Sequence, residues 1–344
     1  MRTRSMLLLL PLVACSSEAT EQPASPAQEG GTSVPPSTDL SKEATEAPVG
    51  EAPTGPLFAT LDPAQSTFHL IDTAHRGGHR VWVAQADDLD GAPGGVIAAA
   101  RPAAALDAPP TRVDVTGLDG VWVRTNPGRA SGRGGSLMEL LLQAADAGVP
   151  VRNHPMGLVR AASKLYLSCL PAATVPTTYS SASVGRLRDH LAALGGAGVV
   201  KPATGTRGQG TARVTLAQPD LDAVLAAATS GGPAVLQAYV DEAPEGDVRV
   251  HVVDGELLEV DGAAAVVRRV PAEGEWRSNV ALGGQPVPAV ADERIRGIVA
   301  QVGPTLRAHG LWHVGLDVVG ERIVECNVFS PGGLTDIEVF TQTA

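Results

Sequence analysis

Short apolar stretches alternate with helical patterns between residues 57 and 153, and this alternation restricts the fold more than any other feature. Strand patterns cover residues 57–61, 79–85, 120–124 and 149–153, and a helical pattern covers 66–75. A second helix is predicted over 136–148, because Ser136 and Glu139 form a capping-box pattern and Gly148 follows the last apolar turn. Strands that alternate with helices build an α/β layer around a parallel sheet. We therefore predict an α/β domain over residues 56–153.

The second half of the chain also mixes the two patterns. Helical patterns cover residues 158–172, 183–194, 221–229 and 292–310. Asp254-Gly255 separates two apolar stretches, which is a strong β-hairpin signal. Asp292 should cap the last helix, and Pro304 should kink it because proline removes one backbone hydrogen bond. We predict a second α/β domain over residues 154–344.

The first 15 residues have the layout of a secretory signal. Arg2 and Arg4 precede an apolar stretch over residues 6–13, which is too short to remain as a membrane-spanning helix. The following Leu-Val-Ala-Cys resembles a bacterial lipobox, which implies cleavage before Cys15 and a lipid on that cysteine. The alternatives are an apolar leader that arose by chance and a start codon placed too far upstream.

Residues 16–55 are rich in Glu, Pro, Ser, Thr, Ala and Gly and have no periodic apolar pattern. Such a composition does not offset the entropy lost on ordering, so a disordered acidic linker is predicted. The whole chain is 44% hydrophobic with a net charge of −11 and no basic stretch, which supports a buried core and argues against nucleic acid as the main partner. Three cysteines, Cys15, Cys169 and Cys326, do not form a disulfide framework.

One strand pattern ends in Lys201 and Pro202, and three glycines follow it. Lys201 precedes Gly205, Gly208 and Gly210, whereas a Walker loop has its lysine after the glycines and a dinucleotide fingerprint has another glycine order. The segment is therefore either an ordinary hairpin or a different nucleotide-binding loop, in which backbone N–H groups cover phosphates beside Lys201. Lys164 offers a second cation, although helix lysines usually extend into solvent.

Three oxygen-bearing side chains stand near the end of the chain. Glu325 and Asn327 share one face of a strand, and a three-residue loop over 320–322 would place Asp317 opposite Glu325. Facing carboxylates repel each other unless a cation lies between them, and carboxylate and amide oxygens suit Mg²⁺. The alternative is a solvated sheet face that carries acids by chance.

Arg249 lies in a strand pattern, and Arg277 and Asn279 lie in a loop-like segment. Arginine suits bidentate binding of carboxylate or phosphate, although each of these side chains could instead form a surface salt bridge. Together with the lysines, the glycines and the acids, they predict phosphate binding without a Walker loop.

From about residue 57 to 340 the chain resembles the bacterial glutathione synthetase family of the ATP-grasp superfamily. The resemblance rests on ordered motifs: DP at 62, SKLY at 163, KPATGTRGQG at 201, GDVRVHVVDGE at 246, RVPAEGEWRSN at 269, VGLDVVGERIVECNV at 314 and SPGG at 330. It implies an ATP-grasp fold with two lobes over 154–344, behind an N-terminal Rossmann-like domain.

The resemblance also implies roles for individual residues. Arg249 would stabilise an acyl phosphate, while Arg277 and Asn279 would position phosphate or a substrate carboxylate. Asp317, Glu325 and Asn327 would hold Mg²⁺ or Mn²⁺. The substrate would lie at Ser330, Gly332 and Gly333. The ATP site would consist of Lys164, Lys201, Thr204, Gly205, Gly208, Gly210, Gln237, Ala238, Tyr239, Val240 and Asp247.

The implied reaction joins a γ-glutamyl dipeptide to an amino acid at the expense of ATP, through an acyl phosphate. Departures from the family pattern at Arg207, Val248, Trp276, Ser278 and the glycine pair after residue 331 favour another amino-acid or peptide ligase as an alternative. The family usually carries a last helix at its carboxyl end. We expect this chain, which ends at Ala344, to lack that helix. Family resemblance also suggests a homo-oligomer.

The leader and the ATP site predict different cellular locations for the protein. A lipid on Cys15 would make the membrane a partner and place the protein outside the cytoplasm, where ATP is scarce. Either the chain starts later and stays in the cytoplasm, or it is an exported lipoprotein that binds nucleotide or peptide without catalysis.

Overall fold

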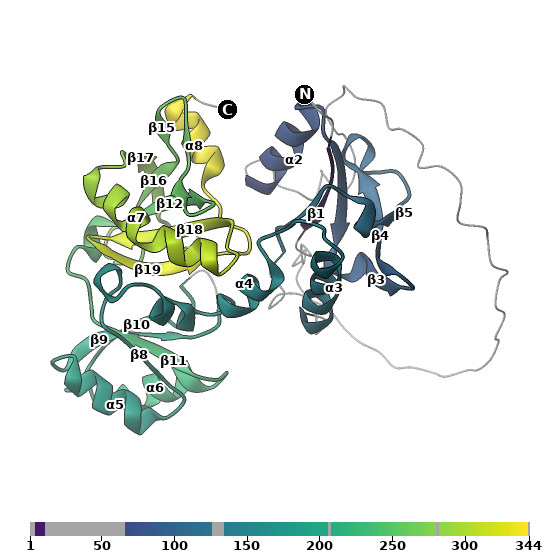
Figure 1. The fold of residues 1–344 in the computed structure, drawn as a ribbon. Helices are drawn as coiled ribbons and strands as arrows, with labels where there is room; N and C mark the ends of the chain where they lie inside the picture. The colour runs from purple at the N-terminus through teal and green to yellow at the C-terminus, as the bar shows by residue number, and fades with distance from the viewer. Residues whose placement is uncertain (1–3, 11–65, 126–133, 206–207, 280–281, 343–344) are drawn as a thin grey trace, which may run out of the picture.

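The computed structural model describes residues 4–10, 66–125, 134–205, 208–279 and 282–342. These residues form three layered units in chain order: an N-terminal domain, a small lobe and a large lobe (Figure 1). Each unit has its own sheet, and on the left of Figure 1 the small lobe lies below the large lobe.

The N-terminal domain contains a mixed sheet in the order β3-β4-β2-β1-β6-β7, with β5 paired to β4. Strands β1 (Ser5–Leu10), β2 (Arg80–Gln85), β6 (Gly120–Val123) and β7 (Val151–Arg152) are parallel, as predicted for this domain. Sequence analysis did not predict the antiparallel strands β3 (Leu89–Ala92), β4 (Gly95–Pro102) and β5 (Thr111–Asp114). Strands β3 and β4 are rich in Ala and Gly and β5 has only four residues, so none of them has a distinct strand pattern.

The two helices of this domain pack on its sheet. Helix α2 (Ser66–Arg76) agrees with the predicted helix over 66–75. Helix α3 (Gly134–Asp146) begins two residues before Ser136, so the prediction that Ser136 caps this helix is wrong. Ser136 is exposed inside the first turn, where the backbone is already helical.

The sequence predicted a leader outside the fold, but part of this leader is a strand of the N-terminal domain. Residues Ser5–Leu10 form β1, which lies between β2 and β6 and pairs with both. Leu7 and Leu8 are fully buried, and Leu8 packs with Ile71, Val81 and Val83. Apolar residues suit a central strand as well as a signal sequence, which is why composition did not distinguish the two. Cys15, the linker over 16–55 and the predicted strand over 57–61 lie outside the described residues.

A broken helical segment connects the N-terminal domain to the lobes. A continuous helix over 158–172 was predicted, but the chain forms α4 (Pro155–Arg160) and a separate 3₁₀ helix at Lys164–Cys169. The His154 side chain caps α4, and the Ser163 side chain caps the 3₁₀ helix. The second cap restarts the helix and places Lys164 at its first position.

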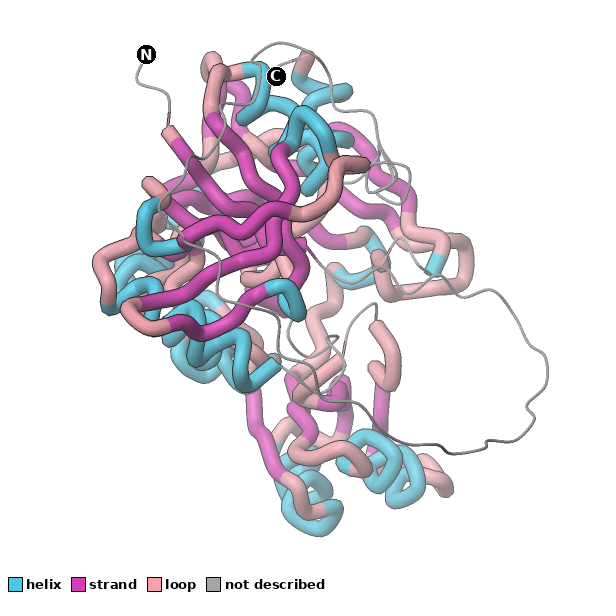
Figure 2. Tube along the Cα trace, turned by 90° about the vertical axis from the view of Figure 1, so that its right-hand side faces the viewer, coloured by secondary structure: helices cyan, strands magenta, loops and turns pink. Residues whose placement is uncertain are grey.

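The small lobe is a four-stranded antiparallel sheet in the order β10-β9-β11-β8. Its strands are β8 (Thr178–Ser181), β9 (Ala197–Pro202), β10 (Ala212–Thr215) and β11 (Ala234–Gln237). Helices α5 (Val184–Ala193) and α6 (Leu221–Thr229) agree with the prediction and bury one face of this sheet. In both views these helices lie at the bottom, away from the large lobe (Figures 1 and 2).

The large lobe is built on the sheet β17-β16-β12-β18-β19, with β13 paired to β12. Asp254 and Gly255 have positive φ and join β12 to β13 in the predicted hairpin. Two short strands, β14 (Glu259–Val260) and β15 (Ala263–Ala264), pair beside this sheet. The sheet strands are β12 (Asp247–Val253), β13 (Glu256–Leu257), β16 (Val266–Val270), β17 (Gln285–Pro288), β18 (His313–Val319) and β19 (Arg322–Asn327).

Two helices belong to the large lobe. Helix α7 (Glu293–Ala308) is capped by Asp292, whose side chain accepts the Ile295 amide at 2.9 Å, and it continues through Pro304. Helix α8 (Leu334–Thr341) follows the last loop. Among the residues that the structure describes, no helix is long and apolar enough to cross a bilayer.

Candidate functional site

An open pocket lies between the sheets of the small and large lobes. We call it the interlobe pocket. It brings together residues from β9, β11, β18, β19 and the loops beside them. Of the residues that sequence analysis selected, it collects Lys164, Lys201, Gly208, Gln237, Ala238, Tyr239, Val240, Asp247, Arg277, Asn279, Asp317 and Glu325.

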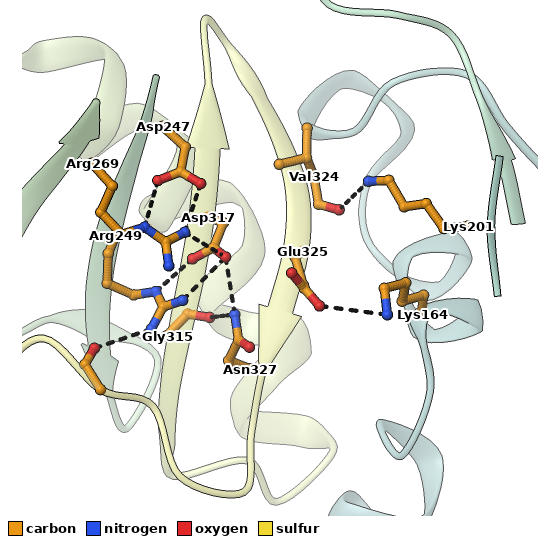
Figure 3. A network of polar contacts seen from close by, with 11 residues as sticks. Lys164, Lys201, Asp247, Arg249, Arg269, Gly315, Asp317, Val324, Glu325 and Asn327 are labelled. Atoms are coloured by element: carbon orange, nitrogen blue, oxygen red, sulfur yellow. Dashed lines mark hydrogen bonds and ion pairs between the residues drawn. The ribbon is translucent and has the colours of Figure 1, made fainter. Parts of the chain in front are cut away.

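Lys201 lies at the end of β9 and points across the pocket toward the large lobe (Figure 3). Its ammonium donates to Gln237 Oε1 at 2.7 Å and to the Val324 carbonyl at 3.3 Å. Burial lowers the pKa of Lys201 to about 8, against the opposing effect of the Glu325 carboxylate. Because burial disfavours an unpaired charge, this lysine is prepared to bind an anion.

Lys164 connects the glycine-rich segment to the acids of β19. Its ammonium donates to the Gly205 carbonyl at 2.9 Å and lies 3.6 Å from Glu325 Oε1. Both predicted cations therefore reach the same pocket from different elements. Thr204, Gly205 and Gly210 belong to this segment but do not line the pocket.

Gly208 has a steric reason to be glycine. Its φ is +72°, and a Cβ atom there would come within 2.7 Å of Asn279 Oδ1. The glycine-rich segment and the loop that carries Asn279 therefore approach each other more closely than a side chain at 208 would permit.

Asp317 and Glu325 are register partners, as predicted, but the predicted loop is wrong. Val319 pairs with Arg322, so the connection has two residues rather than three. A β-bulge between Asp317 and Val318 shifts the register by one residue and restores the Asp317–Glu325 pair. Bulges commonly reorient a side chain near a site, and this one returns the two carboxylates to the same face.

Two arginines hold the Asp317 carboxylate (Figure 3). Arg249 donates to its two oxygens at 2.5 and 3.1 Å, and Arg269 Nη2 lies 2.8 Å from Oδ2. Arg269 also donates to both oxygens of Asp247, at 2.7 and 2.6 Å. The four side chains form a buried network on neighbouring strands β16, β12 and β18.

This network shifts the pKa values of its two acids in opposite directions. Burial by itself would raise the pKa of Asp317, but Arg249 and Arg269 hold that pKa below its usual range. Burial and the negative charge of Asp317 raise the pKa of Asp247, against the effect of Arg269. Burial opposes the charge of Arg269, but Asp317 and Asp247 raise its pKa overall. Asp317 is thus the acid that stays ionised most firmly.

Side chains with the chemistry of a hard divalent cation site are present. Asp317 faces Glu325, and the Asn327 amide lies 3.3 Å from Asp317 Oδ2. In the described part of the chain no three His, Cys, Asp or Glu side chains form a metal cluster, so Asn327 and a ligand's own oxygens would complete the set. These oxygen donors fit a hard divalent cation, and the neighbouring arginines and lysines are countercharges to the acids.

Arg277 makes contacts that the sequence did not indicate. It forms a bidentate pair with Glu275, at 3.1 and 2.6 Å. Its Nη1 also lies 3.4 Å from the carbonyls of Gly208 and Thr211. In this structure Arg277 therefore holds the glycine-rich segment against the large lobe.

The segment over 330–333 lies outside the interlobe pocket, on the other side of Arg249. Arg249 Nη1 donates to the Gly332 carbonyl at 3.0 Å, and Arg124 Nη2 donates to the Pro331 carbonyl at 3.1 Å. Ser330 Oγ lies 3.5 Å from Thr67 Oγ1, and Gly333 precedes α8. This segment joins the large lobe to the N-terminal domain.

Sequence reasoning missed three contributors to the site. Arg269 bridges Asp247 and Asp317, and Arg124 contacts the segment over 330–333 although its own side chain is buried. Trp276 lines the interlobe pocket. Arg269 and Trp276 lie in the motif over 269–279, from which sequence analysis had selected Arg277 and Asn279, whereas Arg124 ends the strand pattern over 120–124. The tertiary contacts of these three side chains were the missing information.

Family models match almost the whole described chain. The model for the prokaryotic glutathione synthetase N-terminal domain matches residues 58–159, and the model for its ATP-grasp domain matches residues 163–342. A glutathione synthetase of Parasynechococcus marenigrum is 34% identical over 298 residues, covering 83% of this chain and 92% of that protein. One from Gloeobacter violaceus is 33% identical over 298 residues and covers 81% and 89%.

Solved structures share the fold at low identity. D-alanyl-alanine synthetase A from Vibrio cholerae aligns with a TM-score of 0.54 at 12% identity, over 100% of this chain and 95% of that chain. The D-cycloserine synthetase DcsG aligns with a TM-score of 0.52 at 20% identity, over 76% and 85%. The predicted ATP-grasp fold is thereby confirmed. With both of its domains matched in order, the chain belongs to the prokaryotic glutathione synthetase family.

Proposed function

We propose that this ATP-dependent amide-forming ligase joins the carboxylate of a γ-glutamyl dipeptide to the amine of glycine. ATP would first phosphorylate the carboxylate, and the amine would then displace phosphate from the acyl phosphate. Such a reaction depends on positioning and on stabilising negative charge more than on a general base. The observation that carries this proposal is the meeting of Lys164, Lys201 and the Asp317–Glu325 pair in one pocket between two lobes.

The pocket residues have separate tasks in this proposal. Lys201 and Lys164 would bind phosphate oxygens, because both ammonium groups reach the pocket and Lys201 is poorly solvated. The glycine-rich segment over 204–210 would supply backbone N–H groups to the same phosphates. The backbone of residues 237–240 would receive the adenine, since these residues line the pocket where β11 ends.

Asp317, Glu325 and Asn327 would hold Mg²⁺ or Mn²⁺. Such an ion neutralises the charge of the β- and γ-phosphates and orients them. The protein's own part is to keep the two carboxylates on one face, which the β-bulge at Asp317 achieves. Glu325 is the more accessible of the two acids, with 28% of its side chain exposed against 3% for Asp317.

Arg249 has the position expected of a residue that stabilises the acyl phosphate. It lies between Asp317 and the Gly332 carbonyl and so between the nucleotide site and the proposed substrate segment. Ser330, Gly332 and Gly333 would contact the dipeptide there, next to Arg124 of the N-terminal domain. Asn279 would contribute from the opposite loop together with Arg277.

The test is product formation. The purified chain with ATP, Mg²⁺, γ-glutamylcysteine and glycine should release ADP and phosphate and form glutathione, detected by mass spectrometry. Glu325→Gln should abolish turnover, whereas Glu321→Gln, in the turn between β18 and β19, should not. A second mixture of γ-glutamyl dipeptides and other amino acids tests for a different peptide ligase. ATP cleavage with none of these would contradict the proposed reaction.

The lipid on Cys15 and a homo-oligomer stay predictions. Cleavage before Cys15 would remove β1, so a lipoprotein and a domain built on Ser5–Leu10 exclude each other in the same molecule. Intact mass of the protein from membrane and soluble fractions of the native host distinguishes them. A lipid-bearing product that starts at Cys15 would favour an exported binding protein, and light scattering would give the oligomeric state.

A further inference from the structure

Trp276 extends from the large lobe to the wall of the small lobe. It lies in the loop between β16 and β17 and lines the interlobe pocket. Its indole meets the ring of Tyr239 edge to face, with 6.0 Å between the ring centroids and 66° between their planes. The contact spans the two sides of the pocket.

Tyr239 also contacts a cation. The Arg213 guanidinium, on β10, lies over the tyrosine ring at 4.1 Å from its centroid. Arg213, Tyr239 and Trp276 therefore form one contact series from three separate elements. A tyrosine ring that contacts both a guanidinium and an indole is held in a defined orientation.

The interlobe pocket has two chemically different ends. Lys164, Lys201, Asp317 and Glu325 mark its charged end, where phosphates are proposed to bind. Other lining residues are apolar. Ala238, Tyr239, Val240 and Ala243 follow β11 directly, and we call the part of the pocket that they line its apolar end. Because Trp276 contacts Tyr239, the indole belongs to the apolar end.

We propose that Trp276 contacts the base of the bound nucleotide and covers the apolar end of the pocket. The inference rests on the proposed function, since it concerns the same nucleotide site. An indole offers a large, weakly hydrated π-face to a purine, and base–aromatic stacking favours any base with such a face. A small residue at 276 would leave this end of the pocket open to water.

The neighbouring residue connects this contact to the phosphate end. Arg277 lies near the carbonyls of Gly208 and Thr211 and is anchored by Glu275. Consecutive residues of one loop thus touch the apolar end of the pocket and the glycine-rich segment. A base that stacks on Trp276 also stabilises the position of Arg277 against that segment.

The first test compares ATP with inorganic tripolyphosphate, each with Mg²⁺, by calorimetry. Trp276→Ala should weaken ATP binding about tenfold, as expected for one lost base–aromatic contact, and leave tripolyphosphate binding unchanged. Trp276→Phe should recover most of the ATP affinity. Lys201→Met should weaken both probes, and retained tripolyphosphate binding shows that the Trp276→Ala protein is folded. Equal weakening of both probes, or unchanged ATP affinity, overturns the proposal.

The second test uses fluorescence. The chain has four tryptophans, at positions 82, 122, 276 and 312. ATP should change the emission of the parent protein and of Trp82→Phe, which alters the N-terminal domain, but not that of Trp276→Phe. If the parent protein binds ATP but its emission changes no more than that of Trp276→Phe, the role of Trp276 is contradicted and the proposed function is not. A parent protein that binds no ATP contradicts the proposed function itself.

Discussion

Asp317 and Glu325 face each other across β18 and β19, yet different cations hold the two carboxylates. Asp317 is bound by Arg249 and Arg269 and is almost fully buried, whereas Glu325 is partly exposed and lies near Lys164 from another element. The pair therefore combines a structural acid with a more accessible one. Their different surroundings predict different consequences when each is neutralised.

Asp317→Asn should destabilise the protein, and Glu325→Gln should not. Removing the Asp317 charge leaves Arg249 and Arg269 buried with less compensation, which should cost about 3 kcal/mol of unfolding free energy. Glu325→Gln removes only a long, partly exposed ion pair with Lys164, worth at most about 1 kcal/mol. Urea unfolding measures both. Equal loss of stability in the two variants would contradict this division, although both should lose turnover.

Nucleotide affinity should fall as the pH rises through about 8. Burial lowers the pKa of Lys201 to about 8, so the free protein loses this charge above that pH and must take up a proton when phosphate binds. The affinity should therefore decrease by up to about tenfold per pH unit above pH 8. Calorimetry at pH 8.5 in buffers of different ionisation enthalpy measures the proton uptake. Lys201→Arg, which stays charged, should remove this uptake, and a parent protein without it would refute the prediction.

A buried histidine pair should make the protein sensitive to acid. His251 Nδ1 lies 3.1 Å from His313 Nε2, and both rings are buried. Burial, and secondarily the charge of Arg249, lowers the pKa of His251 to about 3, while burial and Arg124 lower the pKa of His313. The unfolded chain takes up protons near pH 6.5 that the folded chain does not, so stability is lost as the pH falls below 6.5.

The expected loss from His251 alone is about 2 kcal/mol between pH 7 and pH 5. The double variant His251→Leu/His313→Phe removes both ring partners together and leaves no half-satisfied hydrogen bond. Thermal unfolding of parent and variant at several pH values gives the two slopes. The variant should have the smaller slope below pH 6.5, and parallel curves would exclude the histidines as the cause.

The central position of β1 predicts that the leader supports the N-terminal domain. Leu7 and Leu8 are fully buried, so Leu7→Ala/Leu8→Ala should lower the unfolding free energy by at least about 4 kcal/mol. Deletion of residues 1–14 should have a larger effect. Met6→Leu is the matched control, because Met6 is only partly buried. Unchanged stability after the deletion would mean that another segment fills this position, and the predicted strand over 57–61 is the candidate.

The site illustrates how far sequence reasoning extends. Spacing alone placed Glu325 and Asn327 on one face, because side chains in a strand alternate. The opposition of Asp317 to Glu325 was predicted from a three-residue loop, whereas the structure has a two-residue connection and a β-bulge. Arg269 escaped notice because nothing in its own strand indicates that Asp247 and Asp317 lie beside it on β12 and β18.

The sequence by itself determined the local elements with strong signals: the Asp254-Gly255 hairpin, helices α5, α6 and α7, and an ordered series of motifs specific enough to identify the family. These depend on propensity, capping and residue order, all of which act along the chain. Only the tertiary structure decided that Ser5–Leu10 is a central strand, that Asp317 is neutralised by two arginines and that Trp276 reaches Tyr239. Those outcomes depend on which distant segments compete for one position, and that competition is decided by packing and desolvation rather than by local pattern.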